Sequence, residues 1–368
     1  MSNEKDSRLK IFIENVKFPM LAVLLSFIIG AIFIILSGNN PIVAYGALFS
    51  GSLGGISRIG ETLLKTTPLI FTGLAISFAF RCGLFNIGAE GQYVIGAIST
   101  VAAAYIFRDL PPFLLVLIVL LFGALGGAVW AGITGFLKAK LGVHEVITSI
   151  MLNYTSLHVS NYFVRTALNP STLQGAANKA HTVLIPDTAK LTKLNEWISV
   201  FGHSSVHTGI FIAIICAFIA YLILFKTTLG YEIRSVGQSP LAAEYGGISI
   251  TKNLVLSMLI SGAFAGLAGA TQIAGLTYKV DMAPASPGYG FTGIAVALVG
   301  KNHPLGVLIS ALLFGILSNG ARKMQIAGIP QEVVGIIQGV IIIFIAGEQI
   351  LKYISKIKAK KSKSEEVA

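Results

Sequence analysis

The sequence predicts an all-α integral membrane protein of about ten transmembrane helices, with discontinuous elements and with both termini in the cytoplasm. Of its 368 residues, 54% are hydrophobic and only 12% are charged, whereas charged residues make up about 25% of an average soluble domain. Apolar runs of about 20 residues recur along the whole length, and a helix of that length crosses the hydrocarbon core of a bilayer. We expect residues 1–368 to form a single transmembrane domain.

Much of the formal net charge of +11 comes from lysines and arginines near the two ends of the chain. Basic flanks of this kind are typical of cytoplasmic ends of membrane proteins. Residues 1–17 are therefore interpreted as a cytoplasmic N-terminal segment and residues 351–368 as a cytoplasmic basic tail. The charge indicates contact with membrane lipid and no nucleic-acid partner.

Ten apolar runs define the predicted spans. In chain order they are 19–36, 63–80, a third ending near 106, 113–137, 146–164, 210–225, 254–275, 291–299, 305–317 and 333–350. The eighth is short for a full crossing. Segment 38–58 is expected to be an outer connection with room for a short helix. Arg322 and Lys323 fall on the outer side, against the positive-inside tendency.

Two polar segments interrupt the second half. Residues 167–209 are predicted to be an extracellular loop, either a landing surface for a soluble partner or a plain connector. Residues 226–252 are predicted to be cytoplasmic, with Arg234 and Lys252 as support.

The segment after the second span interrupts the apolar pattern. Its glycines Gly83, Gly88 and Gly91 weaken a continuous helix, and Asn86 is suited to cap a new one. Glu90 follows in the first turns, where the helix dipole favours an anion. A charge in the membrane interior costs roughly 2.5–3.5 kcal/mol on insertion scales. Glu90 therefore either belongs to a pathway or gate, or pairs with Arg81 or a neighbouring helix and holds the bundle together.

Two spans contain a G-x-x-x-G pair, Gly123–Gly127 and Gly262–Gly266, which predicts close helix packing. The fifth span is unusually polar. Its polar residues are Thr148, Ser149, Asn153, Tyr154, Thr155, Ser156, His158, Ser160 and Asn161. They either bond between helices or line a hydrophilic passage.

Metal chemistry is not indicated. Cys82 and Cys216 lie in or beside apolar runs without C-x-x-C spacing, so neither a disulfide nor a zinc site is expected. His144-Glu145 and His158 do not complete H-E-x-x-H.

A short helix is predicted inside the segment 226–252. Ser239 is a favourable cap, Pro240 suits the first helical position, and Gly246-Gly247 ends the helix. Leu241 and Tyr245 are four residues apart and share one face. This helix is either a contact surface for another protein or an ordinary turn between spans.

Three stretches carry a resemblance to a known family: GLFNIGAEGQYVIGA (83–97), EVITSIMLNY (145–154) and GYEIRSVGQSPLAAEYGGI (230–248). The chain resembles permease subunits of ABC importers of the ribose and branched-chain amino acid type. It is most similar to the nucleoside, or simple-sugar, subgroup that works with a membrane-anchored lipoprotein receptor. The similarity covers most of the chain from about residue 60.

The resemblance implies roles for individual residues. The docking face for the ATPase would be the short helix that begins at Ser239 and Pro240, with Leu241, Ala242, Glu244 and Tyr245 exposed on it. The loop leading to this helix would be shaped by Arg234, Gly237 and Gln238. The translocation route would be lined or gated by Asn86, Glu90, Gln92, Asn153 and Tyr154.

The function implied is that of a multi-pass permease subunit in the bacterial cell membrane. It would translocate nucleosides, such as guanosine, or a related sugar-containing solute by alternating access. The expected partners are an ABC ATPase subunit, a second and different permease subunit, and a lipoprotein receptor. The chain has no G-x-x-x-x-G-K-[ST] phosphate loop, so ATP would be used by the partner and no cofactor by this chain.

Three other functions stay open on the residues alone. One is an ion-coupled secondary transporter with Glu90 as the coupling carboxylate. Another is an intramembrane enzyme, which no Ser/His, Cys/His or paired-acid motif supports. The last is a passive channel.

Overall fold

A computed structural model describes residues 2–197, 199–202, 204–330, 332–345 and 347. These residues form helices, turns and two isolated β-bridges, and none of them lies in a β-strand. The basic tail 351–368 and the end of the tenth predicted span lie outside the described residues. The chain divides into two compact units, Met1–Gly51 with Gly320–Ala368, and Ser52–Asn319.

The first unit contains the N-terminal helices. Helix α1 (Ser2–Leu36) includes the predicted span Pro19–Leu36, and α2 (Pro41–Ser52) is the short helix for which the outer connection had room. The centres of the Tyr45 and Phe27 rings lie 5.3 Å apart. Phe49 stacks on Phe27, with 6.1 Å between the ring centres. A further helix of this unit runs from Glu332 to Ile345.

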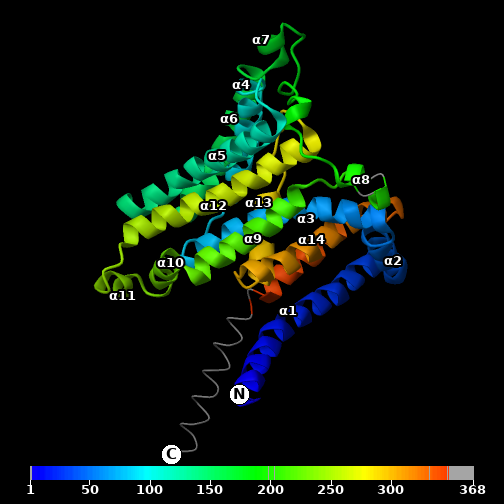
Figure 1. Cartoon of the computed structure of the whole chain (residues 1–368). Coiled ribbons are helices and arrows are strands. Elements are labelled where there is room, and N and C mark those ends of the chain that lie inside the picture. The colour runs from blue at the N-terminus through cyan, green and yellow to red at the C-terminus, as the bar shows by residue number, and fades with distance from the viewer. Residues whose placement is uncertain (1, 198, 203, 331, 346, 348–368) are drawn as a thin grey trace, which may run out of the picture. The chain divides into compact units, whose positions relative to one another are not determined.

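The second unit is a helical bundle (Figure 1). Its long helices are α3 (Ile56–Arg81), α4 (Ala89–Ile106), α5 (Pro112–Leu141), α6 (Glu145–Arg165), α9 (Gly209–Lys226) and α12 (Ile250–Gln272). Across the described part of both units, six helices are long and apolar enough to cross a membrane. They are Pro19–Leu36, Ile56–Arg81, Pro112–Leu141, Gly209–Lys226, Ile250–Thr277 and Pro304–Ile326. The fold is therefore that of a multi-pass helical membrane protein.

The centre of this bundle depends on glycine contacts between α5, α12 and α4. A Cβ on Gly266 would meet backbone atoms of Gly123, and one on Gly127 would meet Gly262 and Gly266, all at less than about 3.1 Å. Real Cβ atoms do not approach backbone this closely, so larger residues would force the helices apart. Both G-x-x-x-G pairs thus pack as predicted, and α5 and α12 run side by side (Figure 1).

The discontinuous element lies after α12. The chain continues into a π-helical turn, η3 (Ile273–Thr277), then through the connecting segment 278–288 into α13 (Tyr289–Val299) and α14 (Pro304–Ile326). Helix α13 has 11 residues, about 16 Å at 1.5 Å per residue, or about half of a 30 Å bilayer core. The eighth predicted span is therefore a half-length helix.

The predicted outer loop 167–209 has small elements of its own: α7 (Pro170–Gln174), η1 (Asp187–Ala189), α8 (Leu194–Trp197) and η2 (Ser199–Phe201). Its backbone bonds to the turn after α12. The Ile185 amide donates to the Tyr278 carbonyl, and the Leu191 amide donates to Ala274. The segment therefore supports η3 and the residues that follow it.

The segment 226–252 contains two helices, α10 (Thr228–Gln238) and α11 (Pro240–Tyr245). The short helix α11 is confirmed. The prediction that Arg234, Gly237 and Gln238 form a loop is wrong, because all three lie in α10. The two glycines of α10 permit close packing. A Cβ on Gly230 would meet the Ile223 carbonyl, and one on Gly237 would meet the carbonyl of Arg81.

Candidate functional site

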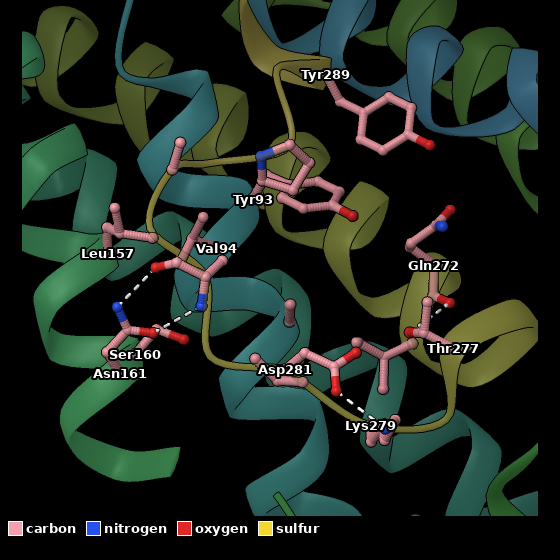
Figure 2. A pocket seen from close by; sticks show the side chains of 16 residues that line it. Tyr93, Val94, Leu157, Ser160, Asn161, Gln272, Thr277, Lys279, Asp281 and Tyr289 are labelled. Carbon is pink, nitrogen blue, oxygen red and sulfur yellow. Dashed lines mark hydrogen bonds and ion pairs between the residues drawn. The ribbon is translucent and has the colours of Figure 1, made fainter. Parts of the chain in front are cut away.

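A cavity of about 320 Å³ lies between α4, α6, the end of α12 with η3, and the connecting segment 278–288. Figure 2 shows the side chains around it, with Tyr93 from α4, Asn161 from α6 and Gln272 from α12. Most of the lining is apolar, with a few polar groups between. This composition is typical of a small-molecule site.

Two tyrosines form the aromatic part of the lining. The rings of Tyr93 and Tyr289 lie 5.5 Å apart at an interplanar angle of 40°. Tyr93 is 4% exposed. Tyr289 is the first residue of α13, so the position of this ring depends on where the helix begins.

The connecting segment is fastened at two points. The Asn161 amide donates to the Ala283 carbonyl at 2.9 Å and accepts from the Ala283 amide at 3.2 Å. Lys279 and Asp281 form an ion pair at 2.9 Å, and both line the cavity (Figure 2). The wall of the cavity is therefore neutral at this edge.

Glu90 fixes the beginning of α13. Its carboxylate oxygens accept from the amides of Gly288 at 2.6 Å and Gly290 at 2.5 Å, and the side chain is fully buried. The free amides and the dipole at a helix N-terminus stabilise an anion. Gly290 permits the approach, because a Cβ there would meet the backbone of Glu90.

The interpretation in which Glu90 pairs with Arg81 is wrong. The alternative, that Glu90 bonds to a neighbouring helix, is confirmed by its hydrogen bonds at the beginning of α13. Arg81 instead donates from Nε to the Asn302 carbonyl at 2.8 Å, in the turn after α13. That turn contains Lys301 and Asn302, both with positive φ. The guanidinium group of Arg81 therefore binds the carbonyl end of this turn.

Three predicted pathway amides bond to the fold. Asn86 and Gln92 exchange hydrogen bonds of 2.9 and 3.0 Å, and Asn86 also donates to Ser261. Asn153 accepts from the Gly91 amide at 2.8 Å and donates to the Ile87 carbonyl. Asn86 does not cap α4, since Gly88 is at the cap position. Together these bonds tie the turn before α4 to α6 and α12.

The predicted pathway residues do not line the cavity. Asn86, Glu90, Gln92 and Asn153 are buried behind it, and Tyr154 is 66% exposed on the surface of α6. The lining residues missed as candidates include Tyr93, Gln272 and Tyr289. Ser160 and Asn161 also line it, and the polar density of the fifth span was the one signal that pointed to them.

The predicted coupling residues of α11 lie on an exposed stub. Leu241 is 79% exposed and Tyr245 is 98% exposed, while Ala243 between them is buried. Ala242 and Glu244 are exposed as well. Ser239 occupies the cap position without a capping hydrogen bond from its side chain, and Pro240 follows as the first helical residue.

Helix α10 connects this stub to the bundle. The guanidinium groups of Arg234 and Arg81 lie over the Phe225 ring, at 5.2 and 5.4 Å from its centre. The Asn253 amide of α12 donates to Glu232 at 3.0 Å. A displacement of α11 would therefore move the ends of α3, α9 and α12 through these contacts.

A multi-pass bundle with a half-length helix, a partly open cavity and a braced, exposed short helix defines a solute permease that works with a further protein. Residues 58–346 match the family described as "Branched-chain amino acid transport system / permease component", and the chain belongs to that family.

Curated relatives agree with this assignment. The chain is 39% identical over 350 residues to the guanosine ABC transporter permease protein NupP of Bacillus subtilis (strain 168), covering 95% of this chain and 98% of that one. It is 41% identical to the nucleoside ABC transporter permease protein NupB of Lactococcus lactis subsp. cremoris (strain MG1363), covering 95% of each. It is also 33% identical to the guanosine ABC transporter permease protein NupQ of Bacillus subtilis (strain 168), covering 73% of this chain and 82% of that one.

These matches decide among the functions left open by the residues. The chain is a membrane-spanning permease subunit of an ATP-driven ABC importer, and ATP hydrolysis belongs to a separate subunit. It is therefore neither an ion-coupled transporter nor an enzyme.

Proposed function

We propose that the chain is one of two different permease subunits of a nucleoside importer in the bacterial plasma membrane, with purine nucleosides such as guanosine as substrates. Relatives named for guanosine and nucleoside transport, at 39–41% identity over 95% of the chain, support this. The similarity to both NupP and NupQ of one organism supports a pair of unlike permeases. The other partners are an ATPase subunit and a membrane-anchored lipoprotein receptor.

The proposed topology has ten membrane segments in one domain, with α13 as a re-entrant half-helix and both termini cytoplasmic. The basic residues near both ends support this orientation. It places α10 and α11 in the cytoplasm and the segment 167–209 outside. Arg322 and Lys323 then lie at the outer end of α14, where a positive pair is unusual.

The observation that carries the proposal is the exposure of Leu241 and Tyr245 on a helix braced by α10. An exposed leucine and tyrosine on one face are suited to a hydrophobic contact with another protein. Closure of the ATPase on ATP would push α11, and α10 would pass the movement to α3, α9 and α12. Asn86, Glu90, Gln92 and Asn153 would then gate the route by holding the walls of the bundle.

The experiment is to express the complete transporter with Leu241→Asp and Tyr245→Asp. We expect the ATPase subunit to be lost on purification and ATP-dependent uptake of tritiated guanosine to fall at least about tenfold, a loss of 1.4 kcal/mol or more in effective docking. Leu184→Asp is the matched control, because Leu184 is a 61% exposed leucine of the outer segment. If the double variant retains the ATPase and full uptake, the docking role is refuted.

A further inference from the structure

We propose that the cavity between α4, α6, η3 and the connecting segment 278–288 is a binding site for the transported nucleoside within this one chain. The base would lie against the Tyr93–Tyr289 pair with Gln272 at its polar edge, and the ribose would reach toward Ser160 on the opposite side of the cavity (Figure 2). This inference rests on the proposed function and deepens it, because it assigns the substrate to residues of a single permease subunit.

The size of the cavity limits the ligand. Its volume is about 320 Å³, at the lower end of the roughly 300–1,000 Å³ of small-molecule sites. A single nucleoside is near the upper limit of what such a volume accepts. An oligosaccharide or a peptide does not fit.

Unused hydrogen-bonding groups indicate that the ligand is polar. Gln272 is 9% exposed, Tyr93 4% and Ser160 3%, and their side-chain polar groups make no hydrogen bond within the described part of the chain. Their polar atoms are not among the fully buried, unpartnered side-chain atoms of the described residues, such as Ser149 Oγ and Ser257 Oγ. They are therefore accessible from the cavity, where a partner satisfies a polar group that would otherwise cost about 1–3 kcal/mol. The amides of Asn86, Gln92 and Asn153, by contrast, all bond within the fold. The cavity groups are therefore available to a ligand or to water.

The chemistry of these groups is that of base recognition. A glutamine amide offers both a donor and an acceptor, which matches the mixed edge of a purine. Tyrosine rings stack on bases with about 1–3 kcal/mol per base in single-strand binding proteins. Figure 2 shows both rings and the Gln272 amide on the same side of the cavity. This combination favours a nucleobase over a plain sugar.

The charges around the cavity select against phosphate. Its lining cation Lys279 is paired with Asp281 at 2.9 Å. The Glu90 carboxylate lies immediately behind Tyr289, on the amides of Gly288 and Gly290. A bound phosphate would therefore meet a neutralised lysine and a nearby negative charge. The site is suited to a nucleoside and not to a nucleotide.

The direct test uses Ser160→Cys, a near-isosteric change, in the complete transporter. Labelling by a charged methanethiosulfonate reagent is followed over the background of Cys82 and Cys216, with and without guanosine. We expect guanosine to slow labelling of this cysteine at least about fivefold, and guanosine 5′-monophosphate to leave it unchanged. Leu184→Cys, exposed in the outer segment, should label at the same rate in both conditions. Absence of protection, or equal protection by the nucleotide, overturns the proposal.

A second arm separates the site from the function. Uptake of tritiated guanosine is measured for the wild type, Gln272→Leu and Tyr93→Leu, together with co-purification of the ATPase. We expect both variants to retain the ATPase and to lose at least about tenfold in uptake. If the wild type takes up guanosine and both variants match it, the site is refuted and the function stands. If the wild type takes up no nucleoside, both are refuted.

Discussion

Glu90 and Arg81 hold opposite ends of one helix, α13, from the two sides of the turn that joins α3 to α4. The acid accepts from the amides of Gly288 and Gly290, and the guanidinium donates to the carbonyl of Asn302 beyond the other end. Each charge has the sign that the helix dipole favours at its end. A half-length helix is thereby fixed in position, and with it the Tyr289 ring and the cavity wall.

Replacement of Glu90 by glutamine should loosen this helix. One carboxylate oxygen becomes an NH₂ group facing a buried amide N–H, which leaves a donor unsatisfied at a cost of about 1–3 kcal/mol. We expect guanosine uptake to fall about tenfold while the ATPase still co-purifies, measured on the purified transporter in vesicles. Asp109→Asn is the control, because Asp109 is an exposed acid. Wild-type uptake by the Glu90→Gln variant would show that the contact is dispensable.

The guanidinium groups of Arg81 and Arg234 both lie over the Phe225 ring, so this ring should transmit movement from α10 to α3. With Phe225→Leu, both cation–π contacts are lost, at about 0.5–1 kcal/mol each. We expect ATP hydrolysis by the assembled transporter to continue while uptake per ATP falls several-fold. Unchanged uptake per ATP would contradict this role.

Close packing at Gly266 predicts a large effect on stability. Gly266→Val places atoms where the backbone of Gly123 lies, and we expect a loss of about 3 kcal/mol or more in folding free energy. Gly46→Ala is the matched change in open space, since a Cβ there has nothing within 4 Å, and it should gain about 0.5–1 kcal/mol. Melting temperatures in detergent would check both. A stable Gly266→Val protein would mean that α5 and α12 pack differently.

His207 should make the segment 167–209 sensitive to acid. Burial lowers the pKa of this imidazole from 6.5 to about 4, and its Nδ1 accepts from the Gly209 amide at 3.1 Å. The folded pKa is below the unfolded one, so its stabilising contribution is complete above pH 6.5 and is lost as the pH falls toward 4. The slope in this window is at most about 1.4 kcal/mol per pH unit.

The substitution His207→Gln keeps an acceptor and removes the titration. Melting temperatures measured between pH 7 and 4.5 should therefore fall less steeply for this variant than for the wild type. Parallel curves for the two proteins would exclude His207 as the source of the acid sensitivity.

What could be predicted from the sequence was local. The spacing of Gly123–Gly127 and Gly262–Gly266 places each pair on one helix face, so close packing followed directly. Ser239, Pro240 and the glycines after Tyr245 were sufficient to locate α11, because caps and stops act within a few residues. The eighth span was recognised as short from its length alone.

What could not be predicted depended on partners far away in the chain. Asn86 was expected to cap a helix, but its side-chain amide donates hydrogen bonds to Gln92 and Ser261. Gly237 was interpreted as part of a loop, but it lies where α10 meets the end of α3. The cavity is formed by residues as distant as Tyr93 and Tyr289, and no local pattern links them.

The most direct test of the account is accumulation of tritiated guanosine in vesicles that contain the reconstituted transporter and its loaded receptor. Accumulation against the gradient is predicted only when the ATPase subunit and ATP are both present, and it should be insensitive to a protonophore. Uphill accumulation by the permease subunits without the ATPase, or its collapse with a protonophore, would contradict the account.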